Sequence, residues 1–480
     1  MMKQLEIETQ CTAPLLTMTS ESCVANGKRI LLCVHQFFPL FSAGTEVLTL
    51  STAQALRACG YTVEIVTATL SERQNPGVTS YLYQGFRVHQ LEVTYLPGRF
   101  SSDTILNEYH NTAISLPFEH LLDEFKPDLV HFFHLKNLTT AALQACFDYQ
   151  VPTVYTPTDY WITCRACQLV KPWGKEECSG PSLLSGNCLK HVVMNRKTGT
   201  VQRLLGLIPS TFFSALIFAS SWFTATRFKK HAQVLRDLAN RNQSIHDSLI
   251  RIDRILPPTL FIESLLLNSG IPQKKITRLR YGILPPLIYR SEAMPDVSAR
   301  RRPVIGFIGT LVDHKGCHVF AQAIKTIPDV NVDFIIYGDT HQYPDYVKKL
   351  EAIIQSDPRV RFMGTFPHEQ IGNILHSMDV LVIPSTWREN APLVLLNAMA
   401  CGTPVVASNV TGITEYLGAT DDVTLFDPGN AGQLAERLVS RLALISDPAH
   451  NQGAGRIAGE PMHAYVSTLS SVYSSLIHSS

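Results

Sequence analysis

The stretch PSTWRENAPLVLLNAMACGTPVV, residues 384–406, decides the fold of the second half of the chain. An apolar run ends in its proline loop, a helical pattern starts near Pro392, and Gly402 ends that pattern before the next apolar run. Strand, loop, helix and strand in this order form the unit of a parallel sheet. Free N–H groups and the helix dipole make such a loop a common phosphate site. We interpret Glu389 in this loop as a ligand for sugar hydroxyls, or as a carboxylate that only complements the dipole.

The same unit recurs along the chain. Strands are predicted at residues 303–308, 332–337, 360–363, 380–383 and 405–407, and, in the first half, at 30–38, 62–67, 129–133 and 153–155. Helical patterns at residues 45–58 and 139–149 lie between strands of the first half. The sequence therefore predicts an α/β protein with two doubly wound parallel-sheet domains.

The domain boundaries follow from these patterns and from a linker rich in proline and arginine near residues 283–301. We expect a flexible N-terminal tail at 1–28, a first domain at 29–285 with a Cys-rich insert at 160–190, a second domain at 302–460 and a C-terminal helix at 461–480. That helix could dock on either domain. Two domains suit a chain of 480 residues, which exceeds the size at which one core stops growing.

Charge and composition narrow the class of protein. The chain carries 41 Lys and Arg against 40 Asp and Glu, a net charge of +1, so no global field attracts nucleic acid. Hydrophobic residues make up 45% and charged residues 17%, the balance of a folded globular protein. Residues 1–28 lack the pattern of a signal peptide, which predicts a cytoplasmic protein.

One uncharged segment, residues 204–226, resembles a membrane segment in length. It is flanked by Arg203 and by Arg227, Lys229 and Lys230, but it contains Pro209 and many hydroxyl side chains. We interpret it as a buried helix or a helix at the lip of the site. Interfacial contact through residues 204–230, on the inner face of a membrane, is the alternative, and a spanning helix is disfavoured.

Four of the eleven cysteines form a separate cluster. Cys164, Cys167, Cys178 and Cys188 fall within 25 residues, whereas the others are scattered and read as reduced thiols. Four thiolates at this spacing can hold zinc, and an iron–sulfur cluster is chemically open as well. Disulfides or free thiols are the alternative. A metal with four protein ligands would be structural, because no coordination position stays open for chemistry.

Residues 384–406 also resemble the signature of the retaining glycosyltransferases of family 4, which have the two-domain GT-B fold. In that family a Glu, seven residues and a second Glu precede an Ala-Met-Ala-x-Gly-x-Pro-Val run. Glu389 matches the first Glu, and Asn397 stands at the second. The resemblance implies that Glu389 contacts the donor sugar and that Asn397 bonds the ribose. Gly412 and Glu415 match a further Gly-Gly-Ile-x-Glu segment of the family.

The stretch GFIGTLVDHKG, residues 306–316, is similar to the family's Gly-Arg-Leu-x-x-x-Lys-Gly. Lys315 matches the lysine that the family directs at the donor diphosphate, where a cation stabilises the leaving group. A solvated loop lysine is the alternative interpretation. Thr310 replaces the family's Arg, so one of two expected cations is missing.

The first half carries looser matches. Residues 37–47 resemble the family's Pro-x-x-Gly-Gly-x-Glu loop, with Gly44 and Glu46 in place, and an ordinary strand–helix turn is the alternative. His134, with His131 behind it, stands where the family carries histidines at the sugar pocket, although a structural His is equally expected. Asp159, in a Thr-Asp-Tyr-Trp segment, could bind the acceptor or cap the chain that follows.

The resemblance implies a hexosyl transfer from a nucleotide-diphosphate sugar to a glycan, lipid-linked or other acceptor, with retention, without a catalytic metal, and typical of polysaccharide biosynthesis. The expected catalytic residues are Glu389, Lys315 and His134. The expected donor-binding residues are Gly309, Thr310, Asn390, Pro392, Leu393, Asn397 and Glu415. The expected acceptor and phosphate loop comprises Gly44, Thr45 and Asp159.

Two rival functions stay open. An epimerase or phosphorylase of the same fold would act on nucleotide sugars or sugar phosphates without transfer to a glycan. A non-catalytic nucleotide-sugar or partner-binding protein would explain Thr310 and Asn397, at which the donor motifs depart from the family.

Overall fold

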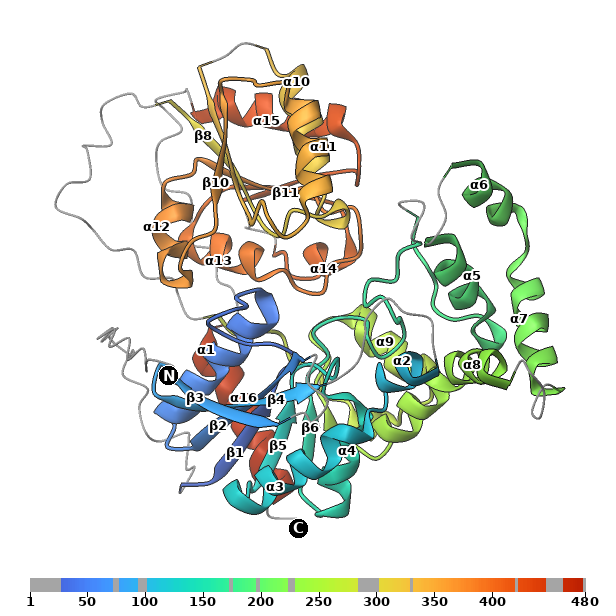
Figure 1. Cartoon of the computed structure of the whole chain (residues 1–480). Coiled ribbons are helices and arrows are strands. Elements are labelled where there is room, and N and C mark those ends of the chain that lie inside the picture. The colour runs from blue at the N-terminus through green and yellow to red at the C-terminus, as the bar shows by residue number, and fades with distance from the viewer. Residues whose placement is uncertain are drawn as a thin grey trace, which may run out of the picture. The chain divides into compact units, whose positions relative to one another are not determined.

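A computed structural model of the chain describes residues 27–71, 77–93, 102–171, 176–195, 199–222, 229–283, 302–328, 331–418, 422–445 and 461–477 (Figure 1). The chain divides into two compact units. The first comprises residues 1–156, 247–255 and 462–480, and the second comprises residues 157–246 and 256–461. The predicted tail, apart from its last two residues, and almost all of the predicted linker lie outside the described residues.

The first unit is built on a seven-stranded sheet with the order β3-β4-β2-β1-β5-β6-β7. Its strands are β1 (Arg29–Cys33), β2 (Thr62–Leu70), β3 (Val78–Tyr83), β4 (Phe86–Val93), β5 (Leu129–Phe132), β6 (Thr153–Tyr155) and β7 (Arg254–Ile255). All neighbours are parallel except β3 and β4. The central strands read as continuous apolar runs because helices bury both faces of the sheet.

The β3–β4 hairpin at the edge of this sheet was missed by the sequence analysis. Its two-residue turn is Gln84-Gly85, with φ values of 48° and 77°, the left-handed geometry that tight hairpin turns require. Alternating exposure along β3 shows why the apolar-run criterion failed, since one face of this edge strand meets solvent. The predicted strand at residues 30–38 is correspondingly shorter and ends at Cys33.

The helices of the first unit are α1 (Gly44–Ala58), α2 (Ser102–Asn107), α3 (Ser115–Phe125), α4 (Thr139–Asp148) and α16 (Met462–Ile477). Helix α16 packs against α1, and α3 packs against α4. The hydroxyl of Tyr473 on α16 lies 2.6 Å from Nδ1 of His131 on β5, and both side chains are buried. The C-terminal helix, which the sequence left free to join either domain, is therefore part of the first unit.

The second unit contains a six-stranded parallel sheet with the order β10-β9-β8-β11-β12-β13. Its strands are β8 (Val304–Ile308), β9 (Asp333–Tyr337), β10 (Val360–Gly364), β11 (Val380–Ile383), β12 (Val405–Ser408) and β13 (Val423–Phe426). Numbered within the unit, this is the order 3-2-1-4-5-6 of a Rossmann sheet. If the edge strand β3 is left out, the strands of the first unit follow the same 3-2-1-4-5-6 order. The predicted pair of doubly wound parallel sheets is thus confirmed.

Helices cover both faces of the second sheet (Figure 1). They are α10 (Cys317–Thr326), α11 (Pro344–Ile354), α12 (Ile371–His376), α13 (Leu393–Cys401), α14 (Thr411–Thr414) and α15 (Ala431–Ile445). Helix α10 packs against α11 and α15, while α12 packs against α13. A hydrophobic core lies between the sheet and the layer formed by α10, α11 and α15. Its fully buried residues include Leu350, Phe334 and Phe320.

A group of helices completes the second unit: α5 (Gly186–Asn195), α6 (Gly199–Leu207), α7 (Ser210–Ala219), α8 (Lys229–Leu249) and α9 (Leu260–Asn268). Lys190 on α5 donates from Nζ to the carbonyls of Gly206 and Ile208, at 2.8 Å each, and so caps the end of α6. Within the described residues, no single helix is long and apolar enough to cross a membrane. Residues 200–207 and 210–222 pass that test only as a pair bent by 80°.

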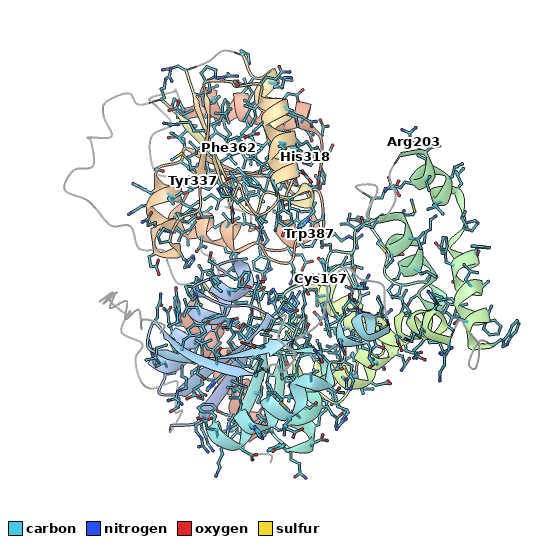
Figure 2. All side chains as sticks on the ribbon, in the orientation of Figure 1. Cys167, Arg203, His318, Tyr337, Phe362 and Trp387 are labelled. Atoms are coloured by element: carbon cyan, nitrogen blue, oxygen red, sulfur yellow. The ribbon has the colours of Figure 1, made fainter. Side chains whose placement is uncertain are left out.

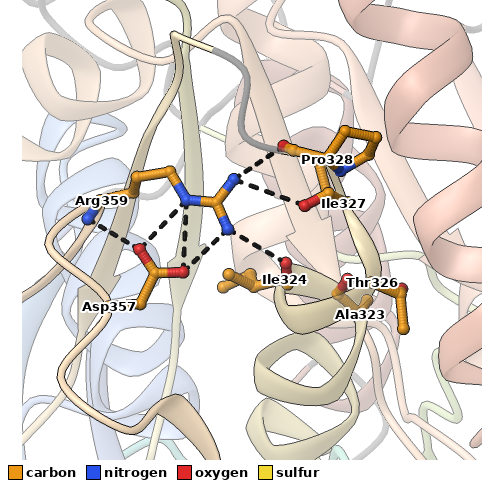
Figure 3. Close-up of polar contacts among 7 residues, drawn as sticks. All are labelled: Ala323, Ile324, Thr326, Ile327, Pro328, Asp357 and Arg359. Atoms are coloured by element: carbon orange, nitrogen blue, oxygen red, sulfur yellow. Dashed lines mark hydrogen bonds and ion pairs between the residues drawn. The ribbon is translucent and has the colours of Figure 1, made fainter.

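Arg359 joins the end of α10 to the strand β10 (Figure 3). Its guanidinium bonds both carboxylate oxygens of Asp357 and donates to the carbonyl of Pro328 at 2.9 Å and of Ile324 at 3.4 Å. The hydrogen bond from Arg359 lowers the pKa of Asp357. The carbonyl of Pro328 lies beyond the helix, and the carbonyl of Ile324 also accepts from the amide of Ile327 at 3.2 Å. The planar cation of Arg359 thus adds hydrogen bonds at the C-terminal end of α10.

We predict that Arg359→Ala lowers the free energy of unfolding of the second unit by about 1–2 kcal/mol, because it removes the cation beside the Asp357 carboxylate and the side-chain hydrogen bonds to the carbonyls of Pro328 and Ile324. The described tryptophans, Trp161, Trp222 and Trp387, all belong to this unit, so tryptophan fluorescence in urea reports its unfolding. The control is Arg361→Ala. Arg361 pairs with Asp333 on an exposed surface, and its loss should change stability by less than about 0.5 kcal/mol. Equal losses in both variants would contradict the role of Arg359.

Candidate active site

Two loops of the second unit meet at the carboxyl ends of β8 and β11. These strands are neighbours at the point where the strand order reverses, which is where open α/β sheets bind ligands. The amide of Thr386 donates to the carbonyl of His314 at 2.9 Å, and its hydroxyl contacts the carbonyl of Asp313 at 3.4 Å. The loop at residues 384–392 is therefore bound to the loop at residues 309–316.

Two glycines permit the close approach of backbone segments here. Gly316 has φ 74°, and a Cβ at this position would lie 1.8 Å from the carbonyl oxygen of Pro384. A Cβ on Gly412 would lie 1.8 Å from the carbonyl oxygen of Glu389. No side chain fits at either position without displacing the loop that carries Glu389.

Lys315 and Glu389 form an ion pair at the centre of these loops. Nζ of Lys315 lies 2.8 and 3.0 Å from the two carboxylate oxygens of Glu389, and the hydroxyl of Ser385 donates to Oε1 at 2.6 Å. Glu389 and Ser385 are buried, whereas Lys315 is 28% exposed. Nζ also lies 5.2 Å from the centre of the Trp387 ring, within the range of a cation–π contact. Figure 2 marks Trp387 in this loop.

The charges at this centre are well defined at neutral pH. Burial alone would raise the pKa of Glu389, but the Lys315 cation and the hydrogen bonds from Lys315 and Ser385 outweigh it and lower the pKa. Burial and the neighbouring Lys315 lower the pKa of His314 to about 4, so that imidazole is neutral. The site thus presents a carboxylate and an ammonium, the two groups that would contact a sugar hydroxyl and a phosphate.

Helix α13 begins directly behind the ion pair. Pro392 is its N-cap and Leu393 its first residue, as the sequence predicted, and no side chain caps this end. Ala391 has φ 65°, a left-handed conformation that costs free energy for a residue with a Cβ. Asn397 lies one turn further along α13 and is buried. The uncapped helix end is available to an anion.

Asn390 and Glu415 bond to protein groups of the same unit. The Asn390 amide donates to the carbonyl of Pro157 at 3.1 Å and accepts from the hydroxyl of Thr259 at 3.3 Å. Oε2 of Glu415 accepts from the amide of Leu260 at 2.5 Å, at the start of α9. Both side chains thus hold neighbouring segments in the present arrangement, in addition to any contact that they make with a donor.

Gly309 and Thr310 lie at the end of β8. The amide of Gly309 donates to the carbonyl of Tyr337 at 3.1 Å, and the carbonyl of Thr310 accepts from Val312 at 3.0 Å. The Thr310 side chain is partly exposed and brings no charge to the site.

Tyr160 contacts the loop at residues 384–392, and the sequence analysis assigned it no role. Its buried hydroxyl lies 3.2 Å from the carbonyl oxygens of both Arg388 and Glu389, and its ring is edge-on to Trp387 at 6.0 Å. Burial and the charge of Glu389 raise its pKa far above the ordinary value, so it remains a donor. Asp159, beside it, accepts from the amide of Trp161 at 2.8 Å, which is the geometry of the capping alternative.

The first unit has a cluster of its own after β1 and β5. The rings of His35 and His134 stack at 4.1 Å, and Nδ1 of His134 accepts from the amide of Lys136 at 2.9 Å. Gly44 and Thr45 begin α1, and Glu46 follows in its first turn. His131, by contrast, is fully buried between Tyr473 and Thr156, which is a structural position.

Glu46 is the most unusual residue of this cluster. It is fully buried, neither carboxylate oxygen makes a hydrogen bond of good geometry, and Oε1 lies 3.8 Å from Nε2 of His35. Burial raises the pKa of Glu46 from 4.5 to about 7, against smaller effects of nearby N–H groups. A buried carboxyl group without satisfied partners is costly, and such groups concentrate at functional sites.

The Cys-rich loop lies in the second unit. All nine described cysteines are free thiols. The backbone amide of Cys167 donates to the carbonyl of Cys164. The side-chain amide of Asn187, the residue before Cys188, lies 3.9 Å from the sulfur of Cys178. Burial and the neighbouring Cys164 raise the pKa of Cys188 to about 12. Among the described residues, no three of the four sulfur atoms lie within 4.8 Å of one another.

Comparison with known families agrees with this architecture. A family model described as glycosyl transferases group 1 matches residues 302–443, and one described as glycosyl transferase 4-like domain matches residues 43–178. The two ranges hold 142 and 136 residues, together more than half of the chain.

Over 149 residues, the chain is 34% identical to the 2-deoxystreptamine glucosyltransferase of Streptomyces kanamyceticus, a match that covers 31% of this chain and 37% of that protein. The chain spans 47% and 38% of the lengths of two further curated relatives, an alpha-maltose-1-phosphate synthase and a D-inositol 3-phosphate glycosyltransferase.

Solved structures share the fold at low identity. Sucrose-phosphate synthase from Thermosynechococcus elongatus aligns with a TM-score of 0.61 at 17% identity, over 94% of this chain and 100% of that one. Anabaena Alr3699/HepE in complex with UDP-glucose aligns with a TM-score of 0.54 at 16% identity, over 94% and 97%. With two sheets of Rossmann strand order and both family matches, the chain belongs to the group 1 glycosyltransferases and has the GT-B fold.

Proposed function

We propose that this protein transfers a hexosyl group from a nucleotide-diphosphate sugar to a hydroxyl of a glycan or lipid-linked acceptor, with retention at the anomeric carbon. The observation that carries the proposal is the Lys315–Glu389 pair, bonded by Ser385, at the point where the strand order reverses.

The donor would bind with its diphosphate between Lys315 and the uncapped N-terminus of α13. As the bond between the anomeric carbon and the diphosphate oxygen breaks, negative charge grows on that oxygen, and the ammonium and the helix N–H groups stabilise it. Glu389 would accept hydrogen bonds from hydroxyls of the sugar, and Asn397 would form a hydrogen bond with the ribose. The Anabaena protein named above binds UDP-glucose, which supports a donor of this class.

The acceptor would be bound by residues of the first unit, namely the loop at Gly44 and Thr45 and the side chain of His134. The acceptor hydroxyl forms the new bond to the anomeric carbon and loses its proton to the departing diphosphate. The imidazole of His134 would orient this hydroxyl through a hydrogen bond. Glu46, next to these residues on α1, would set the charge of the pocket.

We predict that Lys315→Met and Glu389→Ala each lower donor hydrolysis and transfer by about 10²–10³-fold, the typical loss when one preorganised polar group that stabilises the transition state is removed. Lys315 would stabilise the leaving diphosphate, and Glu389 would hold the sugar. The assay measures nucleoside diphosphate release from a panel of nucleotide sugars. The control is Lys349→Met, which removes an exposed lysine paired with Asp313 beside the same loop and should retain wild-type rates.

The two rivals give different results in this assay. Nucleotide binding without turnover of any donor would favour a non-catalytic binding protein, for which Thr310 and Asn397 are the structural argument. Conversion of the sugar without release of nucleoside diphosphate would favour an epimerase.

We predict that Glu46→Gln stabilises the protein above pH 7 and reduces transfer. Because the folded-state pKa of Glu46 is raised, the unfolded chain binds fewer protons between pH 4.5 and 7, so this group costs stability as the pH rises through that window. The substitution should leave the free energy of unfolding unchanged below pH 4.5. Above pH 7 it should raise this free energy by at most about 3 kcal/mol.

Calorimetric unfolding across this pH range measures the effect, with Glu124→Gln as the control on the exposed surface of the same unit. A stability difference that does not change with pH would rule out titration of Glu46. A stabilised variant with full activity would remove Glu46 from the acceptor pocket.

We also propose a structural zinc or iron–sulfur site in the Cys-rich loop, with the thiolates of Cys164, Cys167, Cys178 and Cys188 drawn together by the metal. Purified protein should then contain about one metal site per chain. Cys178→Ser and Cys188→Ser should lose the metal, while Cys401→Ala, on α13 of the same unit, should keep it. Elemental analysis that finds neither zinc nor iron in the wild-type protein would refute the proposal.

A further inference from the structure

The charge of the chain is distributed unevenly around the α6–α7 arm, residues 199–222. Between Glu177 and Asp237 there is no acidic residue. Eight basic residues lie in this interval: Lys190, Arg196, Lys197, Arg203, Arg227, Lys229, Lys230 and Arg236. The rest of the chain therefore holds 33 of the 41 basic residues against all 40 acidic ones. A nearly neutral protein thus contains one strongly cationic region.

The same arm exposes large apolar side chains. On α6, Leu204 and Leu207 are exposed, the latter to 80%. On α7 and the turn after it, Phe212, Phe218 and Trp222 are exposed, the last to 73%. Residues three or four apart are neighbours on a helix surface, as Leu204 and Leu207 are on α6. The rings of Phe218 and Trp222 contact each other edge to face, with 6.0 Å between their centres. The arm therefore exposes apolar side chains in groups.

This surface remains after the arm has packed against its own unit. Phe213, Ser214 and Ile217 on α7 are buried, and the hydroxyl of Ser214 donates to the carbonyl of Leu183 at 2.7 Å. Lys190 fixes the end of α6 from the other side. The exposed apolar side chains are therefore not the ones with which α6 and α7 pack against their own unit.

The length and shape of the arm fit a position along a membrane surface. The two helices are bent by 80° relative to each other, and neither is long enough to cross a bilayer. Short helices with Trp, Phe and Leu on one side and Lys and Arg nearby bind in the headgroup region of anionic membranes. Figure 2 marks Arg203 on α6, among these apolar positions.

We infer that the α6–α7 arm docks this protein onto a bilayer that contains anionic phospholipid. The exposed aromatic and aliphatic side chains enter the interfacial region, and the exposed basic side chains of Arg203, Lys229 and Lys230 bind the headgroups. A second copy of the chain is a poorer partner, because a symmetric contact through this face would bring two cationic regions without acidic residues together. The inference is independent of the proposed transfer reaction, since docking requires no donor.

The test is sedimentation of the full chain with vesicles of phosphatidylcholine alone or with phosphatidylglycerol added. Wild type should bind only the anionic vesicles, and binding should weaken as salt rises. The variant Leu204→Glu/Phe218→Glu should bind them at least about tenfold more weakly. Each change removes an apolar side chain that would enter the bilayer and adds a negative charge that the anionic headgroups repel.

The matched control is Leu82→Glu/Leu116→Glu, which alters two exposed leucines on β3 and α3 of the first unit and should bind like wild type. Thermal unfolding followed by circular dichroism should be the same in both variants as in the wild type, which excludes misfolding as the cause of lost binding. No binding of wild type to anionic vesicles, or equal loss in both variants, would overturn the inference. Conversion of a dimer to a monomer by the arm variant would also overturn it, in favour of self-association.

Discussion

The ion pair between Lys315 and Glu389 holds together the site of the second unit. A carboxylate that is 4% exposed is stable only with a charged partner and hydrogen bonds, and Lys315 and Ser385 supply them. The pair also ties the loop after β8 to the loop after β11, two segments separated by 74 positions in the chain. The contact that charges the site therefore also determines the conformation of both loops, and Gly316 and Gly412 allow them to approach closely enough.

Much of the architecture could be predicted because strands buried on both faces appear in the sequence as apolar runs. β11, with all four residues buried, and β6 were predicted at their observed bounds. The β3–β4 hairpin could not be found by this criterion because one face of β3 is exposed, and β7 has only two residues. Glu389, Lys315 and Pro392 followed from motif spacing. Tyr160 and Trp387 could not, since their contacts with the loop depend on tertiary packing.

Glu389 and Glu46 are both buried glutamates, but their surroundings have opposite effects. At Glu389 a cation and a hydroxyl outweigh burial and lower the pKa, so the carboxylate is a fixed charge. At Glu46 burial dominates and raises the pKa to about 7, so the group gains or loses a proton near neutral pH. The second unit thus carries a permanent anion in its cluster, and the first unit carries a carboxyl group that titrates near neutral pH.

The hydroxyl of Tyr160 has one proton and two carbonyl oxygens, those of Arg388 and Glu389, within 3.2 Å. Equal distances to both oxygens suit a bifurcated hydrogen bond, in which one proton is shared between two acceptors. A single buried phenol thus fixes two adjacent peptide groups, and the backbone at Glu389 depends on a side chain that lies more than 200 positions earlier in the chain.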